Sequence, residues 1–395
     1  MKKICSLLAY AFLFLLLSSV CLAEEAANLT GRCEYIAAPG SQGRKAELLD
    51  DTYLTACTGK YLEIVTPAGE PCYGLYLCFS GRETPFRVEG WQDGLWVTLA
   101  EDSRLYANSY VPLPGAERLR VVPVNAEKIS IAKIAVLGQG DLPAWVQDWR
   151  PFEGKADLLV LSAHADDELL FFGGVIPYYA TEQQKHVAVC YLTDQTSTRR
   201  NELLDGLWLC GIREYPKMGV FKDIKVDSLA DCYQYWGEKN VVDHVTGLLR
   251  EFRPDVVVTH DLRGEYGHGA HRVCADAMRQ AVESAADAAY EPKLGAPWQV
   301  QKLYLHLYKE NALTLDWRQP LSAFDGQTAF DVAKAAFACH ASQRSNGLIV
   351  QDLGEYANNR FGLYFTNVGW DEQKNDLFEH VESQRQDDFY ESEKK

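Results

Sequence analysis

One short segment of the chain combines an imidazole with three carboxyl groups. It begins where an apolar stretch typical of a β-strand stops, and its sequence is Ser162-Ala163-His164-Ala165-Asp166-Asp167-Glu168. Crowded carboxylates repel one another unless a cation lies among them. His164 and Asp167 are three residues apart around the expected turn, so both can bind one metal ion from the same side, while Asp166 faces another way. This segment therefore predicts half of a metal site.

Helix capping is the alternative explanation for the same acidic residues. Asp and Glu near the start of a helix interact favourably with its dipole. This explains Asp166, Asp167 and Glu168, but it gives His164 no role.

A second segment with related chemistry runs from Thr259 to His271. It contains several glycines, follows another apolar stretch, and ends with His268 and His271 where a helix is expected to begin. Two histidines three positions apart share one helix face, so either both bind metal or one binds metal and the other handles a proton. Capping or surface histidines are the alternative, which fits a single residue better than this pair.

Taken together, the two segments predict an open metal site with two imidazoles and one carboxylate, from His164, Asp167 and His271. A metal in such a site lowers the pKa of bound water and polarises a carbonyl group. Asp166 is then available as the general base that accepts the proton of the metal-activated water, and His268 is available to supply a proton. These residue types predict amide hydrolysis.

Four motifs in the chain resemble those of the PIG-L/LmbE-like family of zinc-dependent N-acetylglucosamine deacetylases. They are Ala163-His164-x-Asp166-Asp167-Glu168, Arg199-x-x-Glu202 in a helix that ends at Gly211, Tyr266-Gly267-His268-x-x-His271, and His340-x-Ser342-Gln343. The resemblance covers residues 157–343 and implies a hydrolase that removes an N-acetyl group from a substrate containing N-acetylglucosamine.

The resemblance also implies a role for each site residue. It implies one Zn²⁺ per chain, held by three ligands: His164, Asp167 and His271. Asp166 would be the general base, and His268 an acid or charge stabiliser. Tyr266 would help to bind the oxyanion, and Arg199 would contact the substrate. For Arg199, a surface or salt-bridging arginine is the alternative.

The chain departs from the family pattern at two positions. Ala165 stands where the family usually has proline, which changes the rigidity of the turn and leaves the ligands in place. Ala270 stands where many members have aspartate, so the carboxylate that would orient His268 is missing. Another group, such as Glu265 or Asp261, is expected to replace it.

After residue 155, apolar stretches expected to form strands alternate with stretches expected to form helices. The expected strands are Asp157–Ala163, His186–Leu192, Asp255–Thr259 and Lys302–Tyr308, and the expected helices are Asp167–Ala180, Arg199–Cys210, Val241–Phe252, His271–Glu283 and Thr328–Ser342. This alternation indicates a Rossmann-like, mostly parallel α/β sheet with helices on both faces. Ligands bind such sheets beyond the carboxyl ends of the strands, where the two histidine segments are expected to meet.

The first part of the chain has a different pattern, which predicts a separate domain. Residues 24–145 contain short alternating strands that indicate a jelly-roll-like all-β sandwich. Residues 146–154 are expected to be a linker, 155–370 the deacetylase domain, and 371–395 a charged, mobile C-terminal tail. All nine histidines lie after the linker, so the chemistry is assigned to the second domain.

Aromatic residues in the β domain suggest a further role. The domain resembles small jelly-roll modules that bind carbohydrate, and its candidate residues are Trp91, Trp96, Tyr106 and Tyr110. A domain that only packs and stabilises is the alternative, because aromatic residues in short strands often build a core.

The N-terminus has the layout of an export signal. Lys2 and Lys3 precede an apolar run, and Cys21-Leu22-Ala23 offers a cleavage site. We expect residues 1–23 to be removed as a signal peptide, which predicts an exported, periplasmic or secreted protein without a stable membrane span after cleavage. An uncleaved anchor is the alternative, but the run is short for a membrane span.

Composition limits the partners. The formal net charge is −16, which argues against nucleic acid as a partner. The family resemblance implies an acetylated amino sugar or glycan as the partner instead. No CxxC pair occurs, which argues against a zinc site built from cysteines. Of the 11 cysteines, two lie in the expected signal, and the odd number left implies at least one free thiol. Four of the rest are disulfide candidates in an oxidising compartment: Cys33, Cys57, Cys72 and Cys78.

Two other functions use the same residues. A non-haem iron oxygenase, or another metallohydrolase, also uses two histidines and one carboxylate with open positions. A glycan-binding protein with a structural metal would leave Asp166 and His268 without a role.

The aromatic segment Leu229–Gly237 is either a loop that selects the substrate or part of the core. The oligomeric state is left open.

Overall fold

The structure is a computed structural model that describes residues 24–382 of the 395-residue chain. The expected signal peptide, residues 1–23, and the end of the expected tail, residues 383–395, lie outside the described residues. The described residues form two compact units, 24–79 with 84–147, and 80–83 with 148–382. Within the described range, no helix is long and apolar enough to cross a bilayer.

The first unit contains two antiparallel sheets. The five-stranded sheet has the order β1 (Glu34–Ala37), β3 (Leu62–Val65), β8 (Arg118–Pro123), β5 (Phe86–Gln92) and β6 (Leu95–Asp102), and the four-stranded sheet has the order β2 (Cys57–Gly59), β9 (Ile129–Leu137), β4 (Cys72–Phe79) and β7 (Asn108–Ala116). Buried side chains from both sheets, such as Ile64, Phe86, Leu75 and Ile131, share one apolar core. Alternation along each strand points these residues inward.

Two of the aromatic candidates of this unit lie together outside that core. Trp91 is 40% exposed and forms a cross-strand pair with Trp96, with 5.1 Å between the ring centroids. The Arg120 guanidinium lies 4.4 Å from the Trp96 ring centroid. Tyr110, by contrast, packs against buried apolar side chains. The cysteines of the described range are all free thiols.

The second unit is built around a six-stranded sheet. Its order is β11 (Val187–Tyr191), β10 (Leu158–Ser162), β14 (Val256–Thr259), β15 (Lys302–His306), β17 (Arg360–Thr366) and β16 (Ala312–Thr314). The first four strands are parallel, and β17 and β16 are antiparallel to their neighbours. Every residue of the four parallel strands is buried, which explains their continuous apolar sequences. The expected α/β fold is therefore present.

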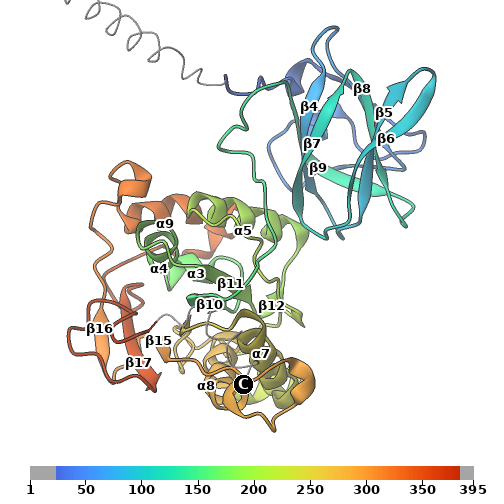
Figure 1. Cartoon of the computed structure of the whole chain (residues 1–395). Helices are drawn as coiled ribbons and strands as arrows, with labels where there is room; N and C mark the ends of the chain where they lie inside the picture. The colour runs from blue at the N-terminus through green and yellow to red at the C-terminus, as the bar shows by residue number, and fades with distance from the viewer. Residues whose placement is uncertain (1–23, 383–395) are drawn as a thin grey trace, which may run out of the picture. The chain divides into compact units, whose positions relative to one another are not determined.

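Helices cover both faces of this sheet (Figure 1). On one side lie α6 (Leu229–Trp236), α7 (Glu238–Phe252) and α8 (Gly269–Ala286), and on the other lie α3 (Asp167–Leu170), α4 (Val175–Pro177), α5 (Ser197–Leu209) and α9 (Ala329–Phe337). The apolar sides of α7 and α8 form one core with inward residues of the strands, among them Leu159, Leu161 and Val257.

Strand order places a crevice at β10. The chain leaves β10 for β11 on one side and later returns to β14 on the other, so the connections after β10 and β14 separate at their carboxyl ends. His164 lies two residues after β10, and His260 follows β14 directly. The sheet therefore brings both histidine segments to one edge, as expected.

The expected helix 167–180 is interrupted. Helix α3 ends at Leu170, and Gly173 and Gly174 separate it from α4. A Cβ atom on Gly173 would lie 2.1 Å from the Asn358 side chain, and one on Gly174 would lie 2.4 Å from the Trp317 ring. Close packing against these side chains leaves room only for glycine, so the helical pattern breaks here.

The boundary expected between the folded domain and the tail, at Asp371, is placed too early in the sequence. Asp371 is buried, where it forms an ion pair with Lys302 and accepts a 2.7 Å hydrogen bond from the Tyr304 hydroxyl. Asp376 accepts a 2.7 Å hydrogen bond from the Tyr179 hydroxyl. A buried ammonium group requires an anionic partner, so the fold extends past residue 370.

The aromatic segment Leu229–Gly237 is helix α6 rather than an open loop. Its Cys232 and Trp236 are buried in the core between α6, α7 and α8, and the Trp236 indole donates a 3.0 Å hydrogen bond to the Lys222 carbonyl. Tyr235 is 70% exposed. Packing is therefore the role of Cys232 and Trp236, whereas Tyr235 faces solvent.

Candidate active site

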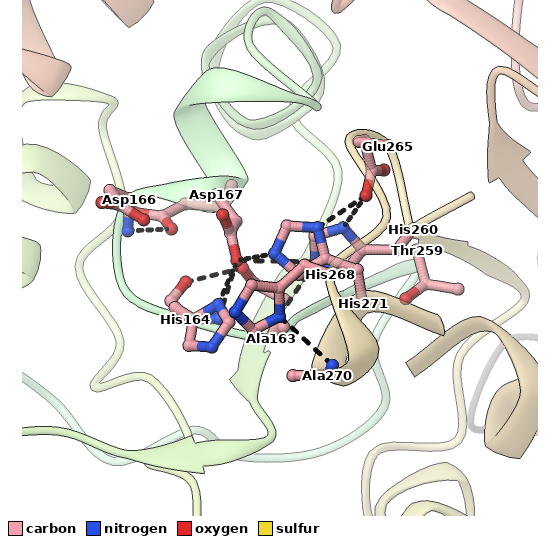
Figure 2. Close-up of polar contacts among 12 residues, drawn as sticks. Ala163, His164, Asp166, Asp167, Thr259, His260, Glu265, His268, Ala270 and His271 are labelled. Carbon is pink, nitrogen blue, oxygen red and sulfur yellow. Dashed lines mark hydrogen bonds and ion pairs between the residues drawn. The ribbon is translucent and has the colours of Figure 1, made fainter. Parts of the chain in front are cut away.

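The turn after β10 holds its side chains in a strained backbone. Asp166 has φ of 114°, a region that residues with a Cβ rarely occupy. Two hydrogen bonds fix the turn, from the His164 amide to Asp167 Oδ2 at 2.9 Å and from the Ser162 hydroxyl to the His164 carbonyl at 2.8 Å. Asp166 and Asp167 consequently point in different directions (Figure 2).

The predicted metal ligands meet at one carboxylate oxygen. Asp167 Oδ2 lies 2.9 Å from His164 Nδ1 and 3.1 Å from His271 Nε2. All three side chains are buried. Figure 2 shows the two imidazoles converging on Asp167 from the ends of β10 and α8.

The arrangement fits a bound metal ion. Nitrogen and oxygen ligands of a tetrahedral zinc ion are about 3.3 Å apart, close to the distances found here. His271 Nε2 is buried and has no hydrogen-bond partner among the described residues. Burial raises the pKa of Asp167, but His271 and His164 outweigh it, and that pKa lies well below its usual value. The carboxylate is an anion facing two potential donor nitrogens.

Glu265 fixes the orientation of His271. Glu265 Oε2 accepts a 2.6 Å hydrogen bond from His271 Nδ1, which leaves Nε2 free to face Asp167. The same carboxylate contacts His260 Nδ1 at 3.1 Å and His306 Nδ1 at 2.9 Å. A carboxylate behind a histidine ligand is a common support of protein metal sites.

His260 and His306 belong to this support and were missed from the sequence. Two groups of side chains are close enough to hold a metal ion: His164, His268 and His271 form one, and Asp167, His260 and His271 form the other. His260 Nε2, however, accepts a 3.0 Å hydrogen bond from the Ala163 amide, and its Nδ1 faces Glu265. Both ring nitrogens are therefore occupied. The available signal was a histidine at or near the carboxyl end of three of the four expected strands, namely His164, His260 and His306.

His268 caps helix α8 instead of pairing with a carboxylate. Its Nδ1 accepts a 3.2 Å hydrogen bond from the Ala270 amide, so the neutral ring carries its proton on Nε2. Burial, followed by the charges of His164 and His271, lowers the pKa of His268 to about 4. The expectation that Glu265 or Asp261 orients His268 is wrong, because Glu265 is bonded to His271 and the helix backbone orients His268.

Asp166 is a buried carboxyl group beside a cation. Burial and the neighbouring Asp167 charge raise its pKa to about 7, and Arg199 opposes this shift. Arg199 Nη2 lies 3.2 Å from Asp166 Oδ2 and also donates a hydrogen bond to the Ala165 carbonyl. The predicted substrate arginine thus contacts the predicted base.

Tyr266 and Asp223 lie at the exposed side of the cluster. Tyr266 is 45% exposed, and its ring centroid lies 5.9 Å from that of His268 and 5.3 Å from that of His271. Asp223, which the sequence did not single out, has Oδ1 3.3 Å from His164 Nε2. Its position after the short strand β13 (Phe221–Lys222) gave no periodic signal.

The last motif holds helix α5 in place. Glu202 accepts hydrogen bonds from the Ser342 amide at 2.8 Å and from the Ser342 hydroxyl at 2.5 Å. His340 is fully buried, with Nε2 3.7 Å from Glu168 Oε1. These contacts fasten the helix that carries Arg199.

Comparison with known proteins identifies the family to which the sequence is similar. Residues 159–282 match the family described as PIG-L: GlcNAc-PI de-N-acetylase. A 1D-myo-inositol 2-acetamido-2-deoxy-alpha-D-glucopyranoside deacetylase of Rhodococcus erythropolis is 30% identical over 237 residues, 47% of this chain and 80% of the relative. The corresponding deacetylase of Rhodococcus jostii is 28% identical, over 47% of this chain and 81% of the relative.

Solved structures include a similar chain. It is the N,N'-diacetylchitobiose deacetylase of Pyrococcus horikoshii, at 17% identity and a TM-score of 0.36, covering 49% of this chain and 72% of that one. The sequence matches define the class as sugar deacetylases. The chain belongs to the PIG-L/LmbE-like family of N-acetylglucosamine deacetylases.

Proposed function

We propose that the protein is a zinc-dependent hydrolase that removes the acetyl group from an N-acetylglucosamine-containing substrate. One observation carries this proposal: His164 Nδ1 and His271 Nε2 both face Asp167 Oδ2, at 2.9 and 3.1 Å. Two imidazoles and one carboxylate are a common ligand set for catalytic zinc, which leaves a position open for chemistry.

His164, Asp167 and His271 would hold one zinc ion per chain. Bound there, zinc supplies Lewis acidity, which polarises the amide carbonyl and makes water a stronger nucleophile at neutral pH. Glu265 keeps His271 in the tautomer that ligation requires. It accepts a hydrogen bond from the N–H group at Nδ1, so the proton stays on Nδ1 and Nε2 is available to a metal.

Asp166 is the general base of the proposed reaction. It accepts a proton from the attacking water at its carboxylate, and its contact with Arg199 at 3.2 Å holds the carboxylate in position. The products are acetate and the free amine of the sugar. The role of Arg199 is therefore to position the base, besides any contact that it makes with the substrate.

His268 and Tyr266 stabilise charge on the substrate. The cap at α8 leaves the His268 Nε2 proton available as a donor, either to the oxyanion or to the departing nitrogen. The Tyr266 hydroxyl is a second donor at the exposed side of the cluster. Both act on atoms that become more negative, or accept a proton, during amide cleavage.

The remaining parts of the proposal concern the context of the enzyme. An exported enzyme, periplasmic or secreted, would meet extracellular glycans. The pair formed by exposed Trp91 and half-buried Trp96 supports a glycan-binding role of the β unit, because sugar rings stack on such side chains.

Acetate release combined with metal analysis tests the function. The full chain should release acetate from N-acetylglucosamine compounds and contain about one zinc ion per chain, and a chelator should abolish both. Oxygen-dependent turnover with bound iron would instead support the oxygenase. Stoichiometric metal in both His164→Ala and His271→Ala would refute the ligand assignment.

A further inference from the structure

A large cavity lies beside the metal ligands, at the same edge of the sheet. Its volume is about 700 Å³, and three segments line it, around residues 261–265, 307–314 and 355–361. The first follows β14, the second follows β15, and the third leads into β17. Because β17 is antiparallel, its first residues lie at the carboxyl ends of β14 and β15. The cavity and the metal ligands therefore share one edge.

Tyr266 separates the cavity from the metal ligands. Its ring centroid lies 5.3 Å from that of His271 and 6.4 Å from that of Tyr356, which lines the cavity. Glu265 also belongs to the cavity lining and bonds His271 at 2.6 Å. A molecule with its acetamido group at the proposed metal ligands would reach the cavity over the exposed side of Tyr266.

The cavity offers aromatic faces beside carboxylates. Burial, followed by the neighbouring carboxylate of Glu310, raises the pKa of Tyr308, and burial and the carboxylate of Glu355 do the same for Tyr356. Packing against Tyr364, with 5.3 Å between ring centroids, holds Tyr308 in place. Sugar rings present C–H groups to aromatic faces and hydroxyl groups to carboxylates, so each pair suits a pyranose.

The charges of the lining also favour a sugar. Three cationic side chains, Arg263, Lys309 and Arg360, face four carboxylates, those of Asp261, Glu265, Glu310 and Glu355. A lining with more carboxylates than cations gives a phosphate no net attraction. The volume is that of a pocket for more than a single ring.

We propose that this cavity binds the sugar rings that adjoin the deacetylated residue, so that the substrate is an oligosaccharide rather than a free monosaccharide. This inference rests on the proposed deacetylase function. The backbone before Tyr308 is fixed in an unusual conformation: Leu307 has φ of 55°, and its amide donates a 3.0 Å hydrogen bond to the Arg360 carbonyl. This strained conformation sets the direction in which the chain continues to Tyr308.

The test compares substrates of different length. The full chain, loaded with zinc, is assayed for acetate release from N-acetylglucosamine and from its β-1,4-linked trimer. The kcat/KM for the trimer should be at least about tenfold higher than that for the monosaccharide. The reason is that each of its two additional rings can stack on an aromatic side chain of the cavity. Equal kcat/KM values for the two sugars would overturn the proposal and leave the deacetylase function intact.

Substitutions locate the effect in the cavity. Tyr356→Ala and Tyr308→Ala should each reduce the preference for the trimer about 5- to 10-fold, and Tyr356→Phe, which keeps the ring, should retain most of it. Tyr235→Ala, an exposed tyrosine on α6, is the matched control. A parallel loss on both sugars in the two alanine variants would refute the cavity as the binding site.

Calorimetry separates this inference from the proposed function. If neither sugar releases acetate, the deacetylase function fails, and trimer binding is then measured directly. Binding that weakens in Tyr356→Ala supports the cavity, and undetectable binding to the parent overturns it.

Discussion

Asp166 and Asp167 are adjacent in sequence and have opposite electrostatic surroundings. Asp167 faces two imidazoles and is held as an anion, whereas Asp166 is buried with a pKa of about 7 and faces Arg199. The backbone at Asp166, with φ of 114°, turns the two carboxylates apart. One residue of the pair is therefore suited to a metal and the other to a proton.

Asp166→Asn should retain the fold and the metal but lose turnover by roughly 10²- to 10⁴-fold. The amide keeps the shape of the side chain and cannot accept the proton of water. Steady-state acetate release, with zinc content measured on the same sample, checks this. A near-parental rate with intact zinc would show that another residue is the base.

His268→Ala should also retain the metal and slow the reaction by roughly 10²-fold, as expected for a lost donor to developing charge. Because His268 caps α8, the variant should in addition lose about 1 kcal/mol of unfolding free energy. Kinetics, metal analysis and denaturant unfolding measure the three effects. Loss of the metal would instead make His268 a ligand.

Spacing was sufficient to predict that His164, Asp167 and His271 meet, because His164 and Asp167 share one turn and His271 lies in the first turn of a helix. It could not predict Glu265 as the partner of His271, since that contact depends on how the loop after β14 folds back. His306 joins the same carboxylate from β15, whose place beside β14 follows only from the strand order. The supporting residues thus depend on tertiary structure.

At the scale of elements, the beginning of β11 is held by an ionic contact. His186 Nε2 lies 2.5 Å from Glu214 Oε2, and its ring stacks on Phe152 with 4.1 Å between centroids. The hydrogen bond to Glu214 is the main cause that raises the pKa of His186. The contact therefore depends on pH.

His186→Gln should destabilise the protein by about 1 kcal/mol near pH 5.5 and by less near pH 9, a modest value because the pair is partly exposed. The folded pKa is raised, so the stabilisation is complete below the unfolded pKa of about 6.5 and is lost as pH rises through the folded value. Urea unfolding at both pH values measures it. An equal loss at both would contradict the charge-based explanation, and Glu214→Gln should remove the same pH dependence.

The α/β order of the elements followed from their apolar patterns, but two details did not. The helix expected over 167–180 breaks at Gly173, because Asn358 lies against it from a distant part of the chain. The segment that forms α6 was not periodic enough to identify as a helix, and its burial of Trp236 decides the conformation. Both outcomes depend on packing that local sequence does not encode.

At the scale of the molecule, the β unit supplies no histidine to the site, and the proposed glycan contact is exposed Trp91 with its half-buried neighbour Trp96. Trp91→Ala combined with Trp96→Ala should lower activity on a polymeric glycan several-fold and leave that on a monosaccharide amide unchanged, because a second binding site raises the effective concentration of a polymer. Acetate release from both substrates measures this. Equal losses on both, with a lower melting temperature, would support a packing role instead.

The ion pair between Lys302 and Asp371 also bears on how the protein is made. Its two residues are 69 positions apart, and both are buried. Until Asp371 has left the ribosome, the ammonium group of Lys302 on β15 has no anionic partner. Burying it in the sheet before that point would cost free energy. The second unit therefore acquires this buried counter-ion only after nearly the whole polypeptide has been synthesised.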